Sequence, residues 1–279
     1  MPQILEEDIT FIITTFRSEK LIDKCIDRLP VNSKKIIIEN SSNYKLKINL
    51  EKKYKNLECF IMENNLGYGA GNNYGIKHSL TRYVFILNPD VEIKPDTIKN
   101  MTNELNQKNF AIAAPFSKDE YSSNIFKNRK IIENKYVKGF AMLIDKEEME
   151  EVGYFDENFF LYLEEIDLCI RAKKSNKNIY LINTEVNHLS GISHGDRNDL
   201  EMEKSRNWHW MWSTFYFNKK HFGYLNALLK TLPKFTSSII KLIIYFVLFN
   251  KKKEIYMMRV KGLLNSYLLS KAFYRPYKG

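Results

Sequence analysis

Short apolar runs alternate with helical patterns through the first half of this chain of 279 residues. Four runs are rich in β-branched and aromatic residues, at positions 9–14, 34–38, 57–62 and 83–87. Continuous runs of this kind are typical of strands that are buried on both faces, as in a parallel sheet. Helices are predicted between the runs, from Ser18 to Pro30 and over 70–80, and after the fourth run over 95–105. This alternation predicts βαβ units and a mostly parallel sheet.

The second half of the chain has a different pattern. Strands are predicted at 110–114, 136–144 and 178–182, and the later part of 159–175 is predicted to be a helix. The polar stretch 117–134 has the composition of a mobile loop. From Leu200 onwards the pattern is helical, without strand alternation. The chain is therefore expected to be an α/β protein with a C-terminal helical extension.

The positive charge of the chain is concentrated at its C-terminal end. Residues 220–279 contain twelve Lys and Arg and one acid, Glu254, so this segment carries +11 of a net +10, and residues 1–219 carry −1. This division predicts a nearly neutral domain over 1–219 and a basic helical region over 220–279. Since the basic residues lie in one tail, and no zinc-finger, helix-turn-helix or aromatic-basic RNA motif is present, no nucleic-acid partner is expected.

The three cysteines, Cys25, Cys59 and Cys169, do not have the spacing of a metal site. They are predicted to be reduced thiols in or near the core of a cytosolic protein. The first residues are polar and acidic, which does not match a signal peptide. A cytoplasmic location follows as the expectation.

A glycine-rich segment, Asn65 to Gly75, follows the third strand and opens a helix. Its spacing does not match the G-x-G-x-x-G of dinucleotide folds, and no Gly-Lys-Ser/Thr follows as in a P-loop. A flexible helix entry is one interpretation of this segment. The amide side chains of Asn65, Asn72 and Asn73 beside the glycines favour the other, close approach to a polar ligand.

The fourth strand runs directly into Asn88-Pro89-Asp90. Asn-Pro-Asp is a good turn former, so a structural role is one explanation. The other is that Asp90 binds a divalent cation, because α/β proteins keep ligands at the carboxyl ends of strands and Mg²⁺ or Mn²⁺ prefers oxygen. Glu92 is expected to point elsewhere.

An acidic cluster lies at Glu164, Glu165 and Asp167, after an aromatic stretch that begins at Tyr154. Most acidic runs are solvated helix faces, but clustered carboxylates against an apolar wall raise one another's pKa, which suits a general base. Asp167 and Arg171 are spaced to pair on a helix, which leaves Glu164 and Glu165 for chemistry. His188, just after a strand, becomes a candidate ligand beside a carboxylate metal site.

Taken together, these segments resemble the family 2 inverting glycosyltransferases with a GT-A fold, especially the rhamnosyltransferase-like branch. The resemblance covers roughly residues 8–223. Its segments occur in the family's order, at 12–18, 37–42, 64–75, 87–91, 138–143 and 152–168. It implies a Rossmann-like mixed, mostly parallel sheet flanked by helices, and transfer from a nucleotide sugar with the help of Mg²⁺ or Mn²⁺.

The resemblance also implies a role for individual residues. Asp90 stands at the metal-binding acid of the family's DxD motif, with Asn88 in place of the first acid, and His188 falls where related enzymes have a His near the metal. Glu165 matches the catalytic base. The donor site is implied to contain nine residues: Thr15, Arg17, Glu39, Asn40, Asn65, Gly67, Asn72, Asn88 and Gly139.

Two departures from the family pattern leave alternatives open. Glu39-Asn40 replaces the usual Asp-Asn, which leaves the base of the nucleotide (UDP, dTDP or GDP) undecided. Glu164-Glu165 replaces Glu-Asp, so Glu164 stays a second candidate for the catalytic base. The sugar, the acceptor and the linkage also stay open.

The basic tail contains an apolar run from Phe235 to Phe249, followed by Lys251 to Lys253 and a second amphipathic run. A helix of 15 residues spans about 22 Å, which is short of the ~30 Å hydrocarbon core of a membrane. An interfacial helical pair over 235–278 on an anionic membrane surface is one interpretation, because the resemblance implies a glycan or lipid-linked acceptor at the inner face of the cytoplasmic membrane. The other is a helical subdomain packed on the core, or a homodimer interface.

Two other functions remain as alternatives. One is a catalytically weak module that binds a nucleotide sugar or glycan and organises a membrane biosynthetic complex. The presence of Asp90, Glu165 and His188 argues against it. The other is a nucleotidyltransferase, which is disfavoured because no glycine-rich basic signature follows the first strand.

Overall fold

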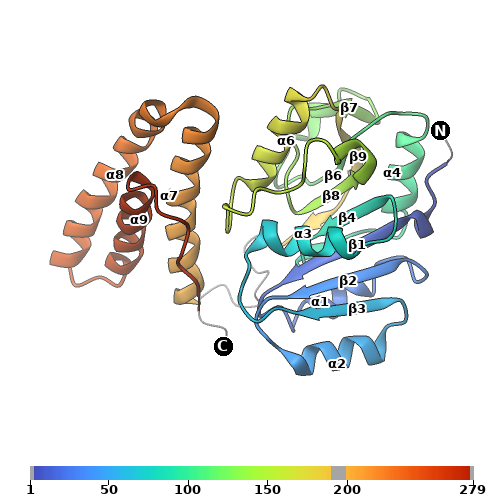
Figure 1. The fold of residues 1–279 in the computed structure, drawn as a ribbon, viewed down its shortest axis with the longest axis horizontal. Coiled ribbons are helices and arrows are strands. Elements are labelled where there is room, and N and C mark those ends of the chain that lie inside the picture. The colour runs from blue at the N-terminus through green and yellow to red at the C-terminus, as the bar shows by residue number, and fades with distance from the viewer. Residues whose placement is uncertain (1–2, 190–198, 277–279) are drawn as a thin grey trace. The chain divides into compact units, whose positions relative to one another are not determined.

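The computed structural model describes residues 3–189 and 199–276 (Figure 1). They form two compact units. The first, here called the sheet unit, comprises residues 3–155 and 165–189, and the second, the helical unit, comprises residues 156–164 and 199–276. Residues 277 and 278 of the predicted membrane-facing segment lie outside the described residues.

The sheet unit is built on a sheet of eight strands with the order β3-β2-β1-β4-β8-β6-β9-β7. Parallel pairing joins β1 to β2 and β4, β2 to β3, and β6 to β9, while β8 runs antiparallel to β4 and β6. The expected mixed, mostly parallel sheet is therefore confirmed. Its strands are β1 Ile9–Thr15, β2 Lys34–Glu39, β3 Leu57–Ile61, β4 Tyr83–Leu87, β6 Ile112–Phe116, β7 Ile131–Glu133, β8 Ala141–Asp145 and β9 Ile179–Glu185.

Helices cover both faces of this sheet. One hydrophobic core joins the sheet to α1, α2 and α4, and a second core on the opposite face joins it to α3, α5 and α6. Alternate residues of one strand enter different cores, as Ile12 and Ile13 of β1 do, since successive side chains of a strand point to opposite faces. The helices are α1 Ile22–Ile26, α2 Tyr44–Lys53, α3 Tyr68–His78, α4 Thr97–Leu105, α5 Lys146–Met149 and α6 Glu164–Lys174, with short 3₁₀ turns at Glu6–Asp8 and Ser123–Phe126.

Helix α2 and strand β7 are among the elements that the sequence did not predict. Helix α2 has only Leu46 and Leu50 buried, so its apolar pattern is too sparse to stand out among lysines. The stretch 117–134, predicted to be a loop, contains β7, which pairs antiparallel with β9. This three-residue edge strand is too short to show an alternating pattern.

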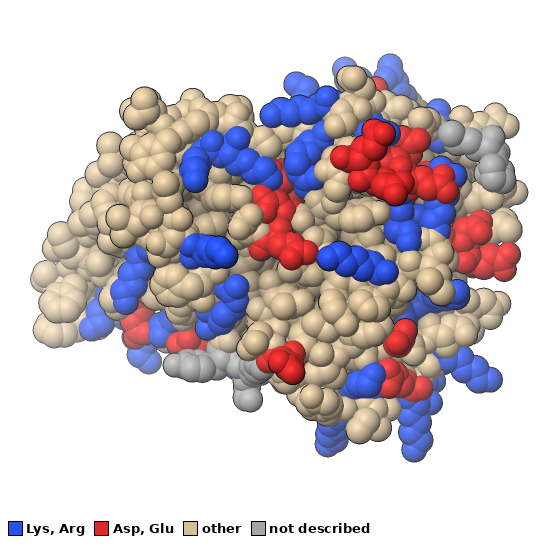
Figure 2. Space-filling model, in the orientation of Figure 1, with Lys and Arg blue, Asp and Glu red and all other residues tan. Residues whose placement is uncertain are grey.

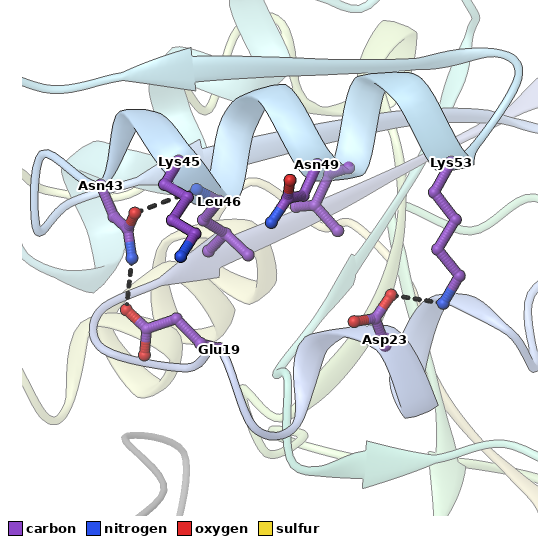
Figure 3. A pocket seen from close by; sticks show the side chains of 8 residues that line it. Glu19, Asp23, Asn43, Lys45, Leu46, Asn49 and Lys53 are labelled. Atoms are coloured by element: carbon purple, nitrogen blue, oxygen red, sulfur yellow. Dashed lines mark hydrogen bonds and ion pairs between the residues drawn. The ribbon is translucent and has the colours of Figure 1, made fainter.

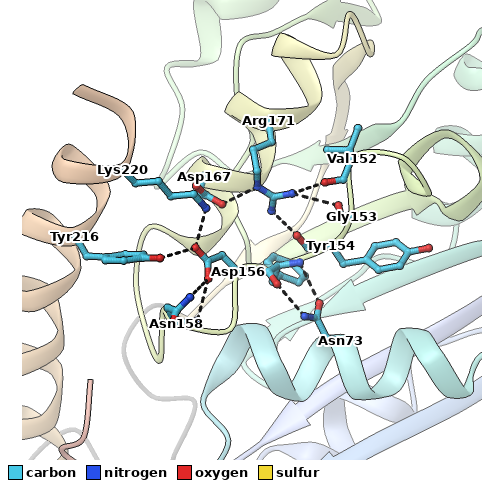
Figure 4. Close-up of polar contacts among 11 residues, drawn as sticks. Asn73, Val152, Gly153, Tyr154, Asp156, Asn158, Asp167, Arg171, Tyr216 and Lys220 are labelled. Atoms are coloured by element: carbon cyan, nitrogen blue, oxygen red, sulfur yellow. Dashed lines mark hydrogen bonds and ion pairs between the residues drawn. The ribbon is translucent and has the colours of Figure 1, made fainter. Parts of the chain in front are cut away.

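The helical unit consists of α7 Leu200–Phe222, α8 Tyr224–Val247 and α9 Lys252–Tyr267. Helices α7 and α9 approach most closely at Gly262, where an added Cβ would lie 2.4 Å from the carbonyl oxygen of Trp208. The segment 156–164 joins this unit through Asp156, which accepts hydrogen bonds from Tyr216 and Lys220 at 2.9 and 2.7 Å (Figure 4). The boundary predicted at residue 220 lies near the end of α7, and α7 packs with α8 and α9.

Helix α8 has its large apolar side chains on the outside of the helical unit. Its buried residues are small or weakly polar, namely Ala227, Thr231 and Ser238. By contrast, Leu225 and Phe246 are 75% and 66% exposed. The other exposed apolar residues of this helix are Leu229, Leu232, Ile240, Ile243, Ile244 and Val247. The helix contains lysines but no acidic residue.

Within the described residues, no helix combines the length and the apolar character needed to cross a membrane. Cys25, Cys59 and Cys169 are buried and free, as their spacing predicts. Burial raises the pKa of the Cys59 and Cys169 thiols to about 12, so they stay protonated.

Candidate active site

The carboxyl end of β4 carries the predicted metal ligand. The backbone N–H of Asn88 donates to the carbonyl of Phe140 at 2.9 Å, which joins this end of β4 to the segment before β8. A turn closes from Asn88 to Val91 through a second backbone hydrogen bond of 3.1 Å. This turn leaves Asp90 buried. The Asn-Pro-Asp segment is thus a turn, and it also positions a carboxylate at the edge of the sheet.

A two-stranded ladder brings His188 to Asp90 from almost a hundred residues away in the sequence. Strand β5, Val91–Glu92, pairs antiparallel with β10, Asn187–His188, so that His188 lies opposite Val91. The backbone N–H of Leu189 donates to the carbonyl of Asp90 at 3.0 Å. As a result, His188 Nε2 lies 3.8 Å from Asp90 Oδ1. The sequence shows no sign of this ladder, because strands of two residues have no periodicity.

These donors suit a divalent cation that is shared with a phosphorylated substrate. A buried carboxylate and an imidazole nitrogen lie side by side, and Oδ1 of Asn88 is buried without a hydrogen-bond partner among the described residues. The described residues contain no group of three or more His, Cys, Asp or Glu that could hold a metal alone. Mg²⁺ and Mn²⁺ commonly take one or two protein ligands and complete their shell with substrate phosphates and water. The residues present therefore fit such a cation.

Glu165 lies in the first turn of α6 and packs against Gly139. A Cβ added to Gly139 would lie 3.3 Å from the Cβ of Glu165, and the Tyr68 hydroxyl donates to the carbonyl of Gly139. Burial raises the pKa of Glu165, and the nearby Glu120 carboxylate raises it as well, while N–H groups of its own helix and the Lys138 ammonium lower it. A carboxyl group with a raised pKa in a site is suited to proton transfer.

Helix α6 is held in place by the side chain of Arg171. Its guanidinium pairs with Asp167 at 2.9 Å, as the i, i+4 spacing predicts. It also donates to the carbonyl of Val152 at 2.9 Å and to those of Gly153 and Tyr154 (Figure 4). Since the guanidinium is bonded on several sides, it anchors α6, the helix that carries Glu165, to the segment 152–154.

Glu164 is in a different setting from Glu165. It is buried, and it ends the segment 156–164 that packs in the helical unit. Glu165 belongs to the sheet unit together with Gly139, Asp90 and His188. Both residues lie in the first turn of α6, so the two candidate bases stay neighbours and differ in what surrounds them.

The expected nucleotide-binding residues lie at the carboxyl ends of β1 and β2. Thr15 is buried at the end of β1, and Arg17 follows with a φ of 55°. Glu39 is fully buried, and its carboxylate accepts from the backbone N–H groups of Ser41 and Asn43 at 3.0 and 2.6 Å. This side chain therefore orders the loop after β2.

The glycine-rich segment is bonded to the end of β2. Asn40 donates from Nδ2 to the carbonyl of Gly67 and accepts from Leu66 N–H, both at 3.3 Å. Gly67 has a φ of 87°, a conformation that favours glycine, and its N–H donates to the Asn65 side chain at 3.0 Å. Asn72 is fully buried, and its Nδ2 has no hydrogen-bond partner among the described residues. A buried amide donor without a partner is costly, unless a ligand accepts from it.

Three residues of this region carry no distinctive signal in the sequence. Tyr68 and Lys138 lie within the segments 64–75 and 138–143, yet their contacts become visible only in the fold. Glu120 lies in the stretch 117–134, and its carboxylate is 3.2 Å from Lys138 Nζ and 3.6 Å from His188 Nδ1. Nothing in the surrounding residues marks it.

A pocket of about 310 Å³ lies beside helix α2 (Figure 3). A hydrogen bond between Glu19 and Asn43 and an ion pair between Asp23 and Lys53 bridge it. None of the expected site residues lines this pocket. Its lining consists of Glu19, Asp23, Asn43, Lys45, Leu46, Asn49, Leu50 and Lys53.

Residues 10–171, more than half of the chain, match the family model described as glycosyl transferase family 2. The chain belongs to glycosyl transferase family 2. The matched range contains Asp90 and Glu165 and ends before His188. The resemblance inferred from the ordered motifs is thereby confirmed.

Two curated relatives are similar to this family member. The low-salt glycan biosynthesis hexosyltransferase Agl10 of Haloferax volcanii is 28% identical over 204 residues, which are 63% of this chain and 65% of Agl10. The chain thus matches somewhat less than two thirds of that relative. The rhamnosyltransferase WbbL of Escherichia coli K12 is 22% identical over 247 residues, which are 75% of this chain and 92% of WbbL.

Solved structures share the fold at low sequence identity. The mannosyltransferase PcManGT from Pyrobaculum calidifontis, in complex with GDP-Man and Mn²⁺, has a TM-score of 0.55 and 11% identity, over 93% of this chain and 86% of that one. S. aureus TarS, residues 1–349, has a TM-score of 0.52 and 12% identity, over 96% and 93%. The expected glycosyltransferase fold is confirmed.

Proposed function

We propose that this family member is a metal-dependent, inverting glycosyltransferase. It moves a hexose, with rhamnose as one candidate, from a nucleotide sugar to a hydroxyl group of a glycan or glycolipid. One observation carries the proposal: the sheet unit holds a carboxyl group of raised pKa, Glu165, and a carboxylate–imidazole pair, Asp90 and His188, around the segment 138–140.

Asp90 and His188 would hold the cation, and Asn88 adds an amide oxygen beside them. When bound, a divalent cation neutralises the charge that develops on the diphosphate leaving group. Support comes from the donor set itself and from the fold shared with PcManGT, whose solved complex contains GDP-Man and Mn²⁺.

Glu165 would take the proton from the acceptor hydroxyl as its oxygen attacks the anomeric carbon. Its raised pKa keeps the carboxylate basic, while the anchoring of α6 by Arg171 and the close packing on Gly139 would orient it. Attack from the side opposite the leaving group inverts the anomeric centre. A positioned general base contributes roughly 10²–10⁴-fold to the rate.

The donor site would be formed by the ends of β1 and β2 and the glycine-rich segment. Asn72 has a buried amide donor ready for an acceptor on the ligand, and Thr15, Arg17, Asn40, Asn65 and Gly67 surround the same edge of the sheet. Glu39 would act on the nucleotide by ordering the loop after β2. A ligand at the carboxyl ends of these strands is the general rule for open α/β sheets.

The acceptor is proposed to belong to a bacterial surface polysaccharide or its lipid-linked precursor. The two relatives are named for low-salt glycan biosynthesis and for rhamnosyl transfer, which favours a glycan acceptor. A screen of UDP, dTDP and GDP sugars would identify the nucleotide base of the donor.

The helical unit is proposed to bind peripherally to anionic lipid at the inner face of the cytoplasmic membrane. Helix α8 exposes large apolar side chains, and Lys230, Lys234 and Lys241 lie on the same helix. In the space-filling view, a broad uncharged area of this unit is bordered by basic side chains on its right and lower sides (Figure 2). Each basic residue near such a surface contributes about 1 kcal/mol to binding. A homodimer through the same face is the competing arrangement.

Base assignment is tested by single-turnover transfer with Glu165→Gln, and Glu164→Gln as the matched variant. We expect Glu165→Gln to abolish transfer while it leaves donor binding intact, and Glu164→Gln to retain transfer. The product of the wild type should have the opposite anomeric configuration from the donor, as determined by NMR. Normal transfer by Glu165→Gln would show that the base is wrongly assigned.

Membrane association is tested by co-sedimentation with vesicles that contain anionic lipid, with purely zwitterionic vesicles as control. The wild type should sediment with the anionic vesicles, and Ile243→Asp should reduce this strongly because it places a charge on the apolar face of α8. Analytical ultracentrifugation without lipid detects the competing homodimer. A protein that is monomeric and does not sediment with anionic vesicles would contradict this part of the proposal.

A further inference from the structure

We infer that Glu120 is a positioning residue, which orients the His188 imidazole so that Nε2 is presented to the cation held with Asp90. The inference rests on the proposed metal site. It adds a residue from the stretch 117–134 that neither the motifs nor the fold family mark. Its basis is the placement of two carboxylates at opposite edges of one imidazole ring.

The two ring nitrogens of His188 face different acids. Nε2 lies 3.8 Å from Asp90 Oδ1, and Nδ1 lies 3.6 Å from Glu120 Oε1. The His188 side chain is only 12% exposed, so rotation of the ring is restricted by its surroundings. A carboxylate accepts hydrogen bonds and donates none when ionised. A cation held with Asp90 would take the lone pair of Nε2, so Nδ1 would carry the proton and face the Glu120 carboxylate.

Glu120 is itself held by a cation. Its Oε2 lies 3.2 Å from Lys138 Nζ, so one carboxylate oxygen faces the lysine and the other faces the histidine. Phe140, two residues after Lys138, stacks on the His188 ring with a centroid distance of 4.5 Å and an interplanar angle of 22°. The segment 138–140 therefore fixes both the acid and the plane of the ring.

A carboxylate behind a metal-binding histidine has a known physical effect. It selects the tautomer, orients the ring and raises the basicity of the ligating nitrogen, and its loss typically weakens metal affinity by about 10–100-fold. Glu120 would act entirely through His188 in this way, without contact with the cation or the sugar.

The tautomer of His188 gives a readout that does not depend on activity. Protein labelled with ¹⁵N-histidine has five imidazoles, and the spectrum of His188→Gln identifies the signal of His188. In the wild type with Mg²⁺ and a nucleoside diphosphate bound we expect the Nδ1–H form to dominate. Glu120→Ala should shift the population toward Nε2–H, whereas Glu120→Gln, which keeps an acceptor oxygen, should shift it less. A wild type that is mainly Nε2–H would overturn the inference.

Manganese affinity gives the second readout. Free Mn²⁺ is measured by electron paramagnetic resonance in titrations with nucleoside diphosphate present. We expect Glu120→Ala to bind Mn²⁺ about 10–100-fold more weakly than the wild type. The matched control is Glu133→Ala on β7. It removes a carboxylate that pairs with Lys173 and should leave the Mn²⁺ affinity unchanged.

The same titrations separate this inference from the proposed function. If Asp90→Asn weakens Mn²⁺ binding and Glu120→Ala does not, the metal site stands and the role of Glu120 is refuted. If neither Asp90→Asn nor His188→Gln changes the affinity, the metal site itself is wrong and the role of Glu120 fails with it.

Discussion

The sheet unit and the helical unit distribute polar and apolar groups in opposite ways. The sheet unit buries polar side chains, such as Glu39, Asn72 and Asp90, where its strands end. Helix α8 of the helical unit does the reverse, since it buries Thr231 and Ser238 and exposes leucines, isoleucines and phenylalanine. A buried polar group costs stability unless it is hydrogen-bonded, and an exposed apolar face costs stability unless something covers it.

This contrast indicates what kind of partner each unit is suited to bind. Buried donors and acceptors at strand ends suit a small polar ligand, whereas an exposed apolar face with lysines suits a large, negatively charged surface. Positive charge is concentrated in the C-terminal part of the helical unit, because residues 220–279 carry +11 and residues 1–219 carry −1. Variants in one unit should therefore change chemistry, and variants in the other should change stability or location.

The largest effect is expected from Asp90→Asn in the sheet unit. Loss of the carboxylate weakens the hold on the cation, and a cation supplies several kcal/mol of transition-state charge stabilisation, so kcat/KM should fall by at least about 100-fold. Steady-state transfer at saturating Mn²⁺ measures it. The matched control is Glu92→Gln, since Glu92 lies two residues away but pairs with Arg28 at 3.3 Å. Equal losses in both variants would mean that the effect is structural.

Gly139→Ala should have the next largest effect. The new methyl group would lie 3.3 and 3.4 Å from Cβ and Cγ of Glu165, so the carboxylate must shift by a few tenths of an ångström. Misplacement on this scale is expected to lower kcat by about tenfold. Thermal unfolding should change little, because the glycine has an ordinary φ. An unchanged kcat would argue against close packing of Gly139 on the base.

The pH dependence of transfer should report on Glu165. The base works only when ionised and its pKa is raised by burial, so kcat falls by about tenfold per unit as the pH drops below that raised pKa. Lys138→Met should move this acid limb to higher pH, because the lysine lowers the pKa of Glu165. A shift of the acid limb to lower pH in Lys138→Met would show that Lys138 does not lower the pKa of Glu165.

Gly262→Ala tests the helical unit and should have the smallest effect on chemistry. An added Cβ would lie 2.4 Å from the carbonyl oxygen of Trp208, so α7 and α9 must move apart, at a cost of about 1–3 kcal/mol in the free energy of unfolding. Denaturant unfolding measures this, with Leu264→Ala on the exposed side of α9 as control. Donor binding by the sheet unit should stay close to that of the wild type, and its loss would show that the units are not independent.

Much of the sheet unit could be predicted from the sequence. The runs of β1, β2, β3 and β4 are long and apolar, and their ends carry Thr15, Glu39 and Asn88 in an order typical of the family. Because parallel strands end at one edge, these residues had to meet there. Local pattern and strand topology together carry this part of the prediction.

The rest depends on contacts between distant segments. The ladder of β5 and β10 that places His188 beside Asp90 has two residues on each strand, too few for a pattern. Glu120 acquires its neighbours only when the segments around 120, 138 and 188 come together. The exposure of the apolar face of α8 could likewise not be predicted, because a sequence shows that a helix is apolar but not which of its sides is buried.

Donor binding with and without Mn²⁺ tests the central claim most directly. A panel of nucleotide sugars is screened by thermal shift on the wild type and on Asp90→Asn. We predict that at least one sugar raises the Tm of the wild type in the presence of Mn²⁺, with a smaller rise when the metal is chelated and a much smaller one in Asp90→Asn. If no nucleotide sugar raises the Tm under either condition, the proposed metal-dependent glycosyltransferase site is contradicted.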